Sequence, residues 1–167
     1  RTWQQYHVGH LQLPVQLDPP ADEPSVAREH ELARVTKQLI SLMDSHKLPT
    51  TWAVSDPAFS AATPLVIRSS VQHEMAILGD ANWVGPTAGR TRFARELARR
   101  VSQARQFGLH VTSFVPRVAT IEGHVDLVVK QQITAISGIS PDASSPRTST
   151  APRAMQFQVW EFPISSE

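Results

Sequence analysis

Leu11-Gln12-Leu13-Pro14-Val15-Gln16-Leu17-Asp18-Pro19-Pro20 is the segment that says most about the architecture of this chain. Residues 11–17 form a strand-like run, and Asp18 with two prolines ends it ahead of a helix. An acidic residue at such a joint is typical of α/β folds, which keep their chemistry where strands end. The same order of strand, acidic or polar stop and helix recurs further along the chain.

The rest of the chain alternates between strand and helix patterns. Ser25 is a plausible N-cap, and Gly108 suits the residue after a helix. Residues 81–90 are expected to be loop because they are rich in Gly and Pro. Residues 140–153 are expected to be a mobile loop because they hold almost no apolar side chain. Strands are predicted at 6–17, 50–54, 74–78, 111–115, 133–136 and 155–164, and helices at 25–47, 64–70, 93–107 and 125–131.

This alternation predicts an α/β fold with a mostly parallel sheet and right-handed crossovers. Five or six strands fit either an open doubly wound sheet or an incomplete barrel. The 167 residues fit one domain spanning the whole chain.

Composition excludes several classes of function. The net charge of +1 argues against a dedicated nucleic-acid or membrane-surface protein. No apolar run approaches the ~20 residues that span a bilayer. The absence of cysteine excludes disulfides, thiolate metal sites and a cysteine nucleophile. Both cytosolic and exported proteins can lack cysteine, and a soluble protein with a slight preference for the cytoplasm is expected.

Four segments resemble the polysaccharide deacetylase family, also called the NodB-homology family. Residues 15–20 sit where that family has Thr-Phe-Asp-Asp-Gly-Pro, and residues 46–54 look like its second strand after a helix. Residues 72–76 look like its Gly-His-Glu-Ile-Gly strand, and residues 93–117 like its next helix and its Arg-Pro-Pro segment. The resemblance covers roughly residues 11–138 and implies an incomplete (β/α) barrel.

Family members use one Asp as a base, while a second Asp and two histidines hold a metal, usually zinc. Asp18 matches the metal-binding Asp, but Leu17 stands at the base position. Neither histidine has a counterpart, in residues 79–84 or in residues 157–161. The resemblance therefore implies a non-catalytic domain without a bound metal or other cofactor, which binds carbohydrate or a protein partner. The alternative is a divalent-metal-dependent carbohydrate or small-amide deacetylase, with a site rebuilt around Asp18 and Asp80.

Predicted strand ends supply the candidate site: Asp18, Asp56, Asp80 and Arg117, with Trp83 in the loop after Asp80. Parallel strands would bring them to one rim. Three carboxylates there can hold Mg²⁺ or Ca²⁺, bind sugar hydroxyls, or cap the helices and turns that follow. Capping is the expected role, with Asp18 as the weak metal candidate. Trp83 either stacks on a sugar or plugs the top of the sheet, and the plug is preferred.

Other polar residues are expected to be structural. His73 begins a strand that Asp80 ends, so roughly 20 Å separates them. His7 and His10 need an irregular backbone to join Asp18, and His30, His46 and His124 look solvated. The arginines from Arg90 to Arg105 are read as the solvated face of a helix. Trp52 and Trp160 are expected in the core.

Overall fold

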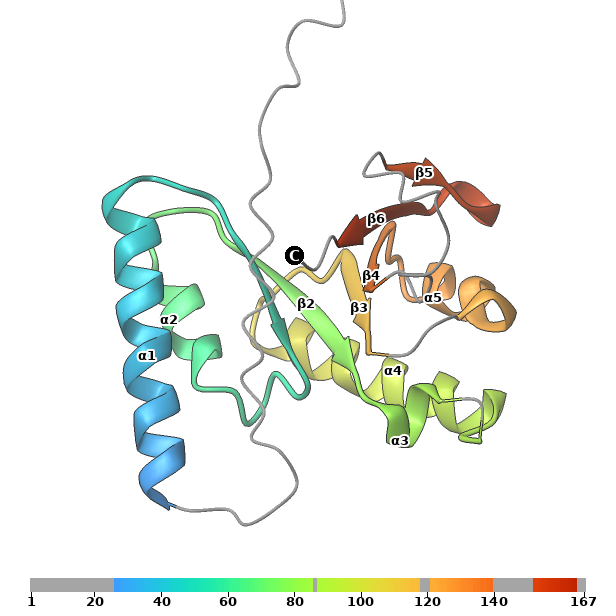
Figure 1. Cartoon of the computed structure of the whole chain (residues 1–167), viewed down its shortest axis with the longest axis horizontal. Coiled ribbons are helices and arrows are strands. Elements are labelled where there is room, and N and C mark those ends of the chain that lie inside the picture. Colours follow the sequence, from blue (N-terminus) through green and yellow to red (C-terminus); the bar gives the residue numbers. More distant parts are fainter. Residues whose placement is uncertain (1–25, 86, 118–120, 140–151, 165–167) are drawn as a thin grey trace, which may run out of the picture.

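One twisted sheet organises the chain, and the computed structural model describes residues 26–85, 87–117, 121–139 and 152–164 (Figure 1). The strand order is β1-β2-β3-β4-β6-β5, and each neighbouring pair is parallel except β5 with β6. The predicted α/β class with a mostly parallel sheet is confirmed, and the described strands do not close into a barrel. The strands are β1 (Thr51–Val54), β2 (Glu74–Gly79), β3 (Ser113–Pro116), β4 (Ala135–Ile139), β5 (Arg153–Ala154) and β6 (Trp160–Ile164).

The helices of the described chain pack against one face of this sheet. Strand residues Trp52, Ile77 and Phe114 share the two main core clusters with all of these helices. Strands β1 to β4 lie side by side in chain order, so right-handed crossovers place every connecting helix on the same side. The helices are α1 (Val26–Ser45), α2 (Ala62–Arg68), α3 (Ala81–Val84), α4 (Arg90–Gln106) and α5 (Val125–Lys130).

A doubly wound sheet would carry helices on both faces. The one-sided arrangement therefore excludes that alternative for the described residues. The opposite face has a smaller buried cluster of its own, made of Ala53, Ala76, Leu78 and Val115.

The apolar residues Leu32, Val35, Leu39 and Met43 recur at helical spacing and predict the inward stripe of helix α1, but the helix turns a different stripe inward. From residue 30 onward, where the burial of its side chains is described, the buried residues are Thr36, Ile40 and Met43, whereas Leu32 and Leu39 are only partly buried. The predicted stripe omitted Thr36 because sequence reasoning sought apolar side chains. The Thr36 hydroxyl is buried and has no hydrogen-bond partner among the residues that the structure describes.

Three helices end in the same way. The N–H groups of Gly108 and Leu109 donate to carbonyls of Arg105 and Ala104, which is a Schellman motif with Gly108 in the left-handed region at φ 74°. Helices α1 and α5 end likewise at Lys47 and Gln132, at φ 53° and 64°. The predicted stop at Gly108 is confirmed.

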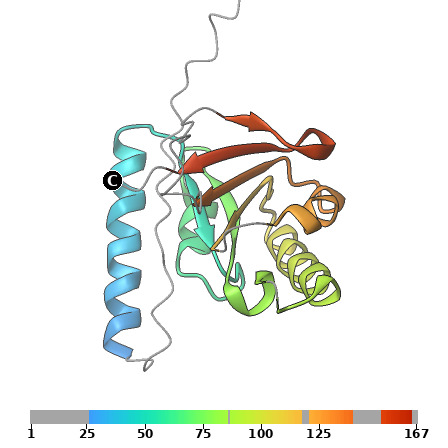
Figure 2. The same cartoon turned by 45° about the vertical axis from the view of Figure 1, so that its right-hand side comes forward.

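The last strand differs most from its prediction. Residues 155–164 were expected to form one strand, but residues 156–158 turn the chain, and β6 begins only at Trp160. Arg153, placed in the predicted loop 140–153, instead belongs to β5, which pairs antiparallel with β6. Figure 2 shows this hairpin, with its turn beside α5. Residues 140–151 lie outside the described residues.

Two smaller corrections concern local structure. Residues 81–90 were expected to be loop, but α3 occupies residues 81–84, because Asp80 caps it. A strand was predicted at residues 133–136, but β4 runs from Ala135 to Ile139, because residues 135–139 pair with β6. The predicted strand 6–17 lies outside the described residues. Among the described helices, none combines the length and apolar character needed to cross a membrane.

Candidate functional site

The carboxyl ends of β1, β2 and β3 lie along one edge of the sheet, as the sequence predicts. Asp56 follows β1, Asp80 follows β2 and Arg117 follows β3. The backbone N–H of Arg117 donates to the carbonyl of Gly79 at 2.8 Å, which joins two of these ends. Asp18 lies outside the described residues. The fold thus brings Asp56, Asp80 and Arg117 to a common edge.

Asp56 is engaged in structural contacts. Its Oδ1 accepts a hydrogen bond from the Ala58 N–H at 3.0 Å, which forms the turn after β1. Its Oδ2 accepts from Arg99 Nη1 at 2.9 Å, and this hydrogen bond raises the pKa of Arg99 above its ordinary value. Asp56 therefore ties the end of β1 to α4.

Arg100 makes the second link between α4 and β1. Its Nε donates to the carbonyl of Ser55 at 2.7 Å, and its Nη1 donates to Glu96 Oε2 at 2.8 Å. The bond from Arg100 is the main cause that lowers the pKa of Glu96. The guanidinium also lies over the Trp83 ring, 4.6 Å from its centroid. Arg100 is 8% exposed, so these contacts form out of water.

Trp83 plugs this edge of the sheet. Its ring packs 5.7 Å from that of Phe93 and 5.9 Å from that of Phe114, and the residue is 2% exposed. An indole covered in this way offers no face to a sugar ring. Gly79 permits this packing, because a Cβ on it would lie 2.5 Å from Val84 and 2.7 Å from the Phe114 ring. The preferred interpretation of Trp83, the plug, is confirmed.

Asp80 caps α3, because its Oδ1 accepts a hydrogen bond from the Asn82 N–H at 2.8 Å. The predicted capping role is confirmed for this carboxylate. Within the described ranges, no group of three or more His, Asp or Glu side chains is arranged to hold a metal ion.

The arginines of α4 act mainly as links to neighbouring elements. Arg90 pairs with Asp126 and donates to the Gly123 carbonyl, and Arg105 donates to the Gln131 carbonyl at 3.0 Å. The prediction of a solvated face is wrong for Arg100, which is buried. Arg90, Arg99 and Arg105 are exposed as predicted, but they also hold neighbouring elements by hydrogen bonds. A guanidinium on a long stem reaches past the helix surface, and sequence spacing does not show where it ends.

His73 lies at the opposite edge, as predicted. Its side chain is fully buried, with Nδ1 accepting from the Thr50 N–H at 3.2 Å and Nε2 lying 2.8 Å from Asp44 Oδ1. The same Asp44 oxygen accepts from Ser69 Oγ at 2.6 Å. The carboxylate stands between hydroxyl and imidazole, so the imidazole does not touch the hydroxyl as a nucleophilic triad requires. The cluster joins α1 to β1 and β2.

Glu74 anchors the same edge. Its carboxylate accepts hydrogen bonds from the hydroxyls of Thr51 at 2.9 Å, Ser113 at 2.8 Å and Thr112. One side chain therefore binds β1 and β3 to β2. Sequence reasoning did not single out Glu74. The signal that could have found it is that Glu74 begins one predicted strand, while Thr51, Thr112 and Ser113 lie at the start of two others.

His124 is half-buried, so the expectation of a solvated side chain is wrong. Its ring centroid lies 4.6 Å from that of Phe93. Burial, followed by the nearby charge of Arg90, lowers the pKa of His124, while Asp126 acts in the opposite direction. The imidazole is therefore neutral at neutral pH, and it packs against the core ring of Phe93.

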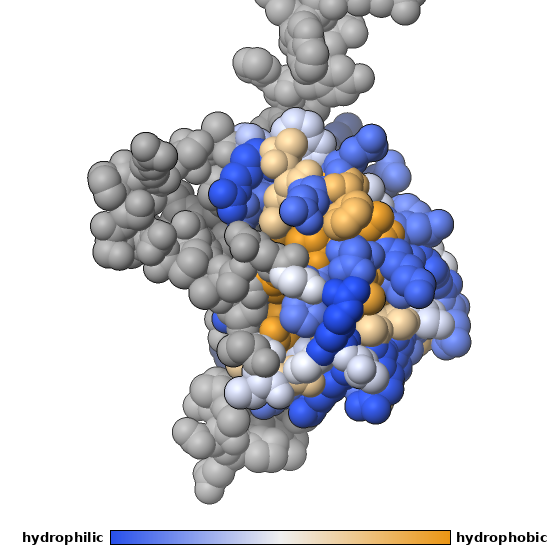
Figure 3. Space-filling view, turned by 90° about the vertical axis from the view of Figure 1, so that its right-hand side faces the viewer, coloured by the Kyte–Doolittle hydropathy of each residue, from blue (hydrophilic) through white to orange (hydrophobic). Residues whose placement is uncertain are grey.

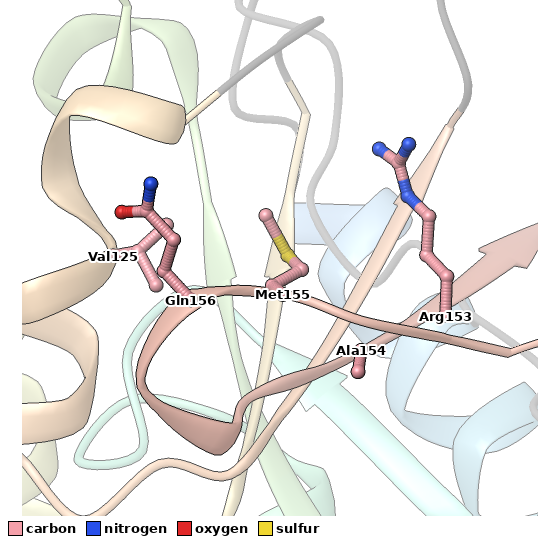
Figure 4. Close-up of a pocket in the computed structure, with 5 residues that line it drawn as sticks. All are labelled: Val125, Arg153, Ala154, Met155 and Gln156. Atoms are coloured by element: carbon pink, nitrogen blue, oxygen red, sulfur yellow. The ribbon is translucent and has the colours of Figure 1, made fainter.

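A hollow lies at another place, beside the hairpin. A cavity of about 370 Å³ is lined by Val125 of α5 and by Arg153, Ala154, Met155 and Gln156. Figure 3 views the face that carries α5 and the hairpin, and apolar surface gathers there among hydrophilic side chains. Figure 4 shows Met155 and Gln156 pointing to the side of the strand on which Val125 lies.

Large aromatic side chains are exposed on the same hairpin. Phe157 is 59% exposed at the turn, and Trp160 is 49% exposed on β6, which contradicts the expected core position of Trp160. Trp160 pairs with Ala154, whereas Arg153 pairs with Glu161. Because alternate residues face opposite sides of a strand, Trp160 lies on the face away from Arg153. Sequence reasoning missed this surface because it treated residues 155–164 as one strand.

The turn that presents Phe157 is unusual in its backbone. The Val159 N–H donates to the Gln156 carbonyl, and the two residues between them, Phe157 and Gln158, have φ of 58° and 62°. Two consecutive left-handed residues are the signature of a type I′ turn, which favours Asn-Gly. Phenylalanine and glutamine both carry a Cβ that opposes this conformation. The turn is therefore strained.

Comparison with family models, with curated proteins and with solved structures found no match to the chain. The resemblance to the polysaccharide deacetylase family stays a prediction.

Proposed function

We propose that the chain is a non-catalytic recognition domain that binds a protein partner through the hairpin β5–β6. The observation that carries the proposal is Phe157, a 59% exposed aromatic residue held at a strained turn. Strain of this kind persists where the surrounding structure enforces it, and it concentrates at functional sites. Asn-Gly would form the same turn with less strain. The turn itself therefore does not require Phe157, and in this proposal the exposed ring serves binding.

The residues around Phe157 have the character of a protein interface. Met155 and Arg153 line the adjacent cavity, and aromatic residues, Met and Arg are the types enriched at interface centres. Such anchors carry most of the binding free energy when they enter a well-packed pocket. The nearly neutral overall charge of +1 agrees with a protein partner better than with nucleic acid.

The contacts at the carboxyl edge support the non-catalytic part of the proposal. Asp56 is held by Arg99 and by a turn N–H, Asp80 caps a helix, and Trp83 is buried. The strand order and the one-sided helices are those of a singly wound sheet, which supports a deacetylase-like incomplete barrel. In this proposal the domain has the incomplete-barrel fold, but its binding site is the hairpin and not the carboxyl ends of the strands.

The enzymatic alternative is a metal-dependent deacetylase rebuilt around Asp18 and Asp80. It needs a firmly held divalent ion and an Asp80 carboxylate that acts on it. Metal analysis of the purified chain, with hydrolysis of acetylated sugars assayed beside Asp80→Asn, tests this alternative. One bound ion per chain and activity that is lost in Asp80→Asn would replace the non-catalytic proposal.

A second candidate function is carbohydrate binding at Trp160. Its half-exposed indole offers a face to a sugar ring, which buried Trp83 does not. Quenching or enhancement of tryptophan fluorescence by oligosaccharides, lost in Trp160→Ala and kept in Phe157→Ala, would favour this candidate over the protein partner.

The test of the main proposal compares two exposed phenylalanines. Immobilised wild-type chain, Phe157→Ala and Phe59→Ala are used to capture proteins from an extract. Phe59 is 86% exposed but lies in the loop after β1, away from the hairpin. A partner retained by wild type and Phe59→Ala but lost with Phe157→Ala supports the proposal. Equal retention by all three proteins contradicts it.

A further inference from the structure

We propose that the hairpin face binds a second copy of this chain, with Phe157 of each copy entering the cavity beside the hairpin of the other. This inference rests on the proposed protein-binding function and names the partner. A two-fold symmetric interface brings the same patch of both subunits together, so the patch must complement itself. The hairpin face meets this requirement in shape and in charge.

In shape, a self-complementary patch needs a protruding side chain next to a cavity that can receive the same side chain from the other copy. Phe157 projects at the turn, and residues 153–156, which lead into that turn, line the cavity of about 370 Å³. Pockets of roughly 300 Å³ and more accommodate groups larger than a single side chain, so a phenyl ring fits. Rotation about an axis beside the turn exchanges the two features between copies.

The walls of the cavity suit an aromatic ring. Val125 is buried and gives an apolar wall, and Met155 is partly buried beside it. A thioether adapts its shape and makes favourable contacts with aromatic rings. The Gln156 amide, which also lines the cavity, can hydrogen-bond to the backbone of an incoming hairpin.

The charge requirement is a pair of opposite charges on the same patch. Arg153 and Glu161 are cross-strand neighbours that form an ion pair, with side chains 69% and 22% exposed. The two charges of each patch cancel, so the approach of a second copy meets no net repulsion, and a two-fold axis can set each Arg153 opposite the other copy's Glu161.

The experiment is sedimentation equilibrium of the whole chain across a concentration series. Wild type is expected to associate to a dimer, and Phe157→Ala is expected to weaken this association by roughly 30-fold, as the loss of an interface hot spot does. Phe59→Ala, the matched control, is expected to associate as wild type does.

Charge variants add a test specific to the second copy. Arg153→Glu alone and Glu161→Arg alone each make the patch uniformly charged, so each protein should be monomeric. A mixture of the two brings complementary patches together and should form a mixed dimer. Circular dichroism spectra like that of wild type establish that both variants are folded.

A monomeric wild type at up to about 1 mM protein, or a mixture that stays monomeric, overturns self-association. Neither result removes the proposed function, because a different protein partner that depends on Phe157 would still be captured from an extract. Loss of both the dimer and Phe157-dependent capture removes both proposals.

Discussion

Replacing the strained turn with its preferred sequence should stabilise the fold. The variant Phe157→Asn with Gln158→Gly keeps the type I′ backbone. Glycine removes the Cβ at residue 158, and asparagine at residue 157 tolerates the left-handed region because its short polar side chain hydrogen-bonds locally. A residue with a Cβ in the left-handed region costs about 1 kcal/mol or more. Phe157 is 59% exposed, so little burial is lost with its ring.

The magnitude comes from these two positions. Relief of about 1 kcal/mol at each residue gives a net gain of about 2 kcal/mol, reduced slightly by the greater flexibility of glycine in the unfolded chain. For a chain of 167 residues this corresponds to a rise in Tm of roughly 4–8 °C.

Urea denaturation and calorimetry measure the effect. Phe157→Ala is the control, because it removes the ring and keeps a Cβ at the left-handed position, so its stability should stay within about 0.5 kcal/mol of wild type. A turn variant that is no more stable than wild type, or less stable, would refute the strain on which the hairpin proposal depends.

Four further predictions concern residues outside the hairpin. Arg100→Met should lower the free energy of unfolding by about 2–3 kcal/mol in urea titrations, because it leaves the Ser55 carbonyl and Glu96 without their buried donor; an unchanged midpoint would contradict this link. Thr36→Val should raise stability by about 1 kcal/mol, because it removes a buried hydroxyl that has no partner in the described part of the chain, and a loss of stability would show that this hydroxyl is satisfied. The pKa of His124 is lower in the folded chain, so the unfolded chain binds more protons as pH falls below about 6.5. Its contribution to stability is therefore complete above that pH and is lost as pH falls through the folded pKa; His124→Gln should flatten this part of the pH profile, and an unaltered profile would count against it. Asp80→Ala should cost about 1 kcal/mol as a lost helix cap, whereas a larger loss would indicate a further role for that carboxylate.

The sequence predicts the parts of this fold that depend on local patterns. The helix ending at Gly108 is predicted by apolar spacing and by a glycine that accepts a positive φ. The strand at residues 74–78 is predicted by a run of apolar residues between polar stops. Asp80 is predicted as a cap by its place between a strand and a polar turn.

Other parts depend on pairing that no local pattern contains. Residues 155–164 alternate partly, which favours one strand, but β5 pairs back on β6, and the chain must turn at Phe157 and Gln158. Neither residue is a turn former, so the hairpin carried no signal in the sequence. Its misassignment also hid the exposure of Trp160.

The candidate site shows the same division. Parallel strands bring Asp56 and Asp80 to one edge, and this was predictable. The residues that bind Asp56 and the Ser55 carbonyl at the end of β1 were not predictable. Arg99 and Arg100 reach them from a helix about 45 residues away in sequence. The hydroxyls around Glu74 gather from neighbouring strands, so their common hydrogen-bond acceptor emerges only once the strands are paired.

Phe157 is kept at a strained turn, in our proposal, because it binds another copy of the chain. The decisive quantity is the association constant of the turn variant Phe157→Asn with Gln158→Gly, determined by sedimentation equilibrium beside wild type. We expect a more stable protein that no longer dimerises. A variant that dimerises as tightly as wild type would show that the phenyl ring is not the reason for the strain.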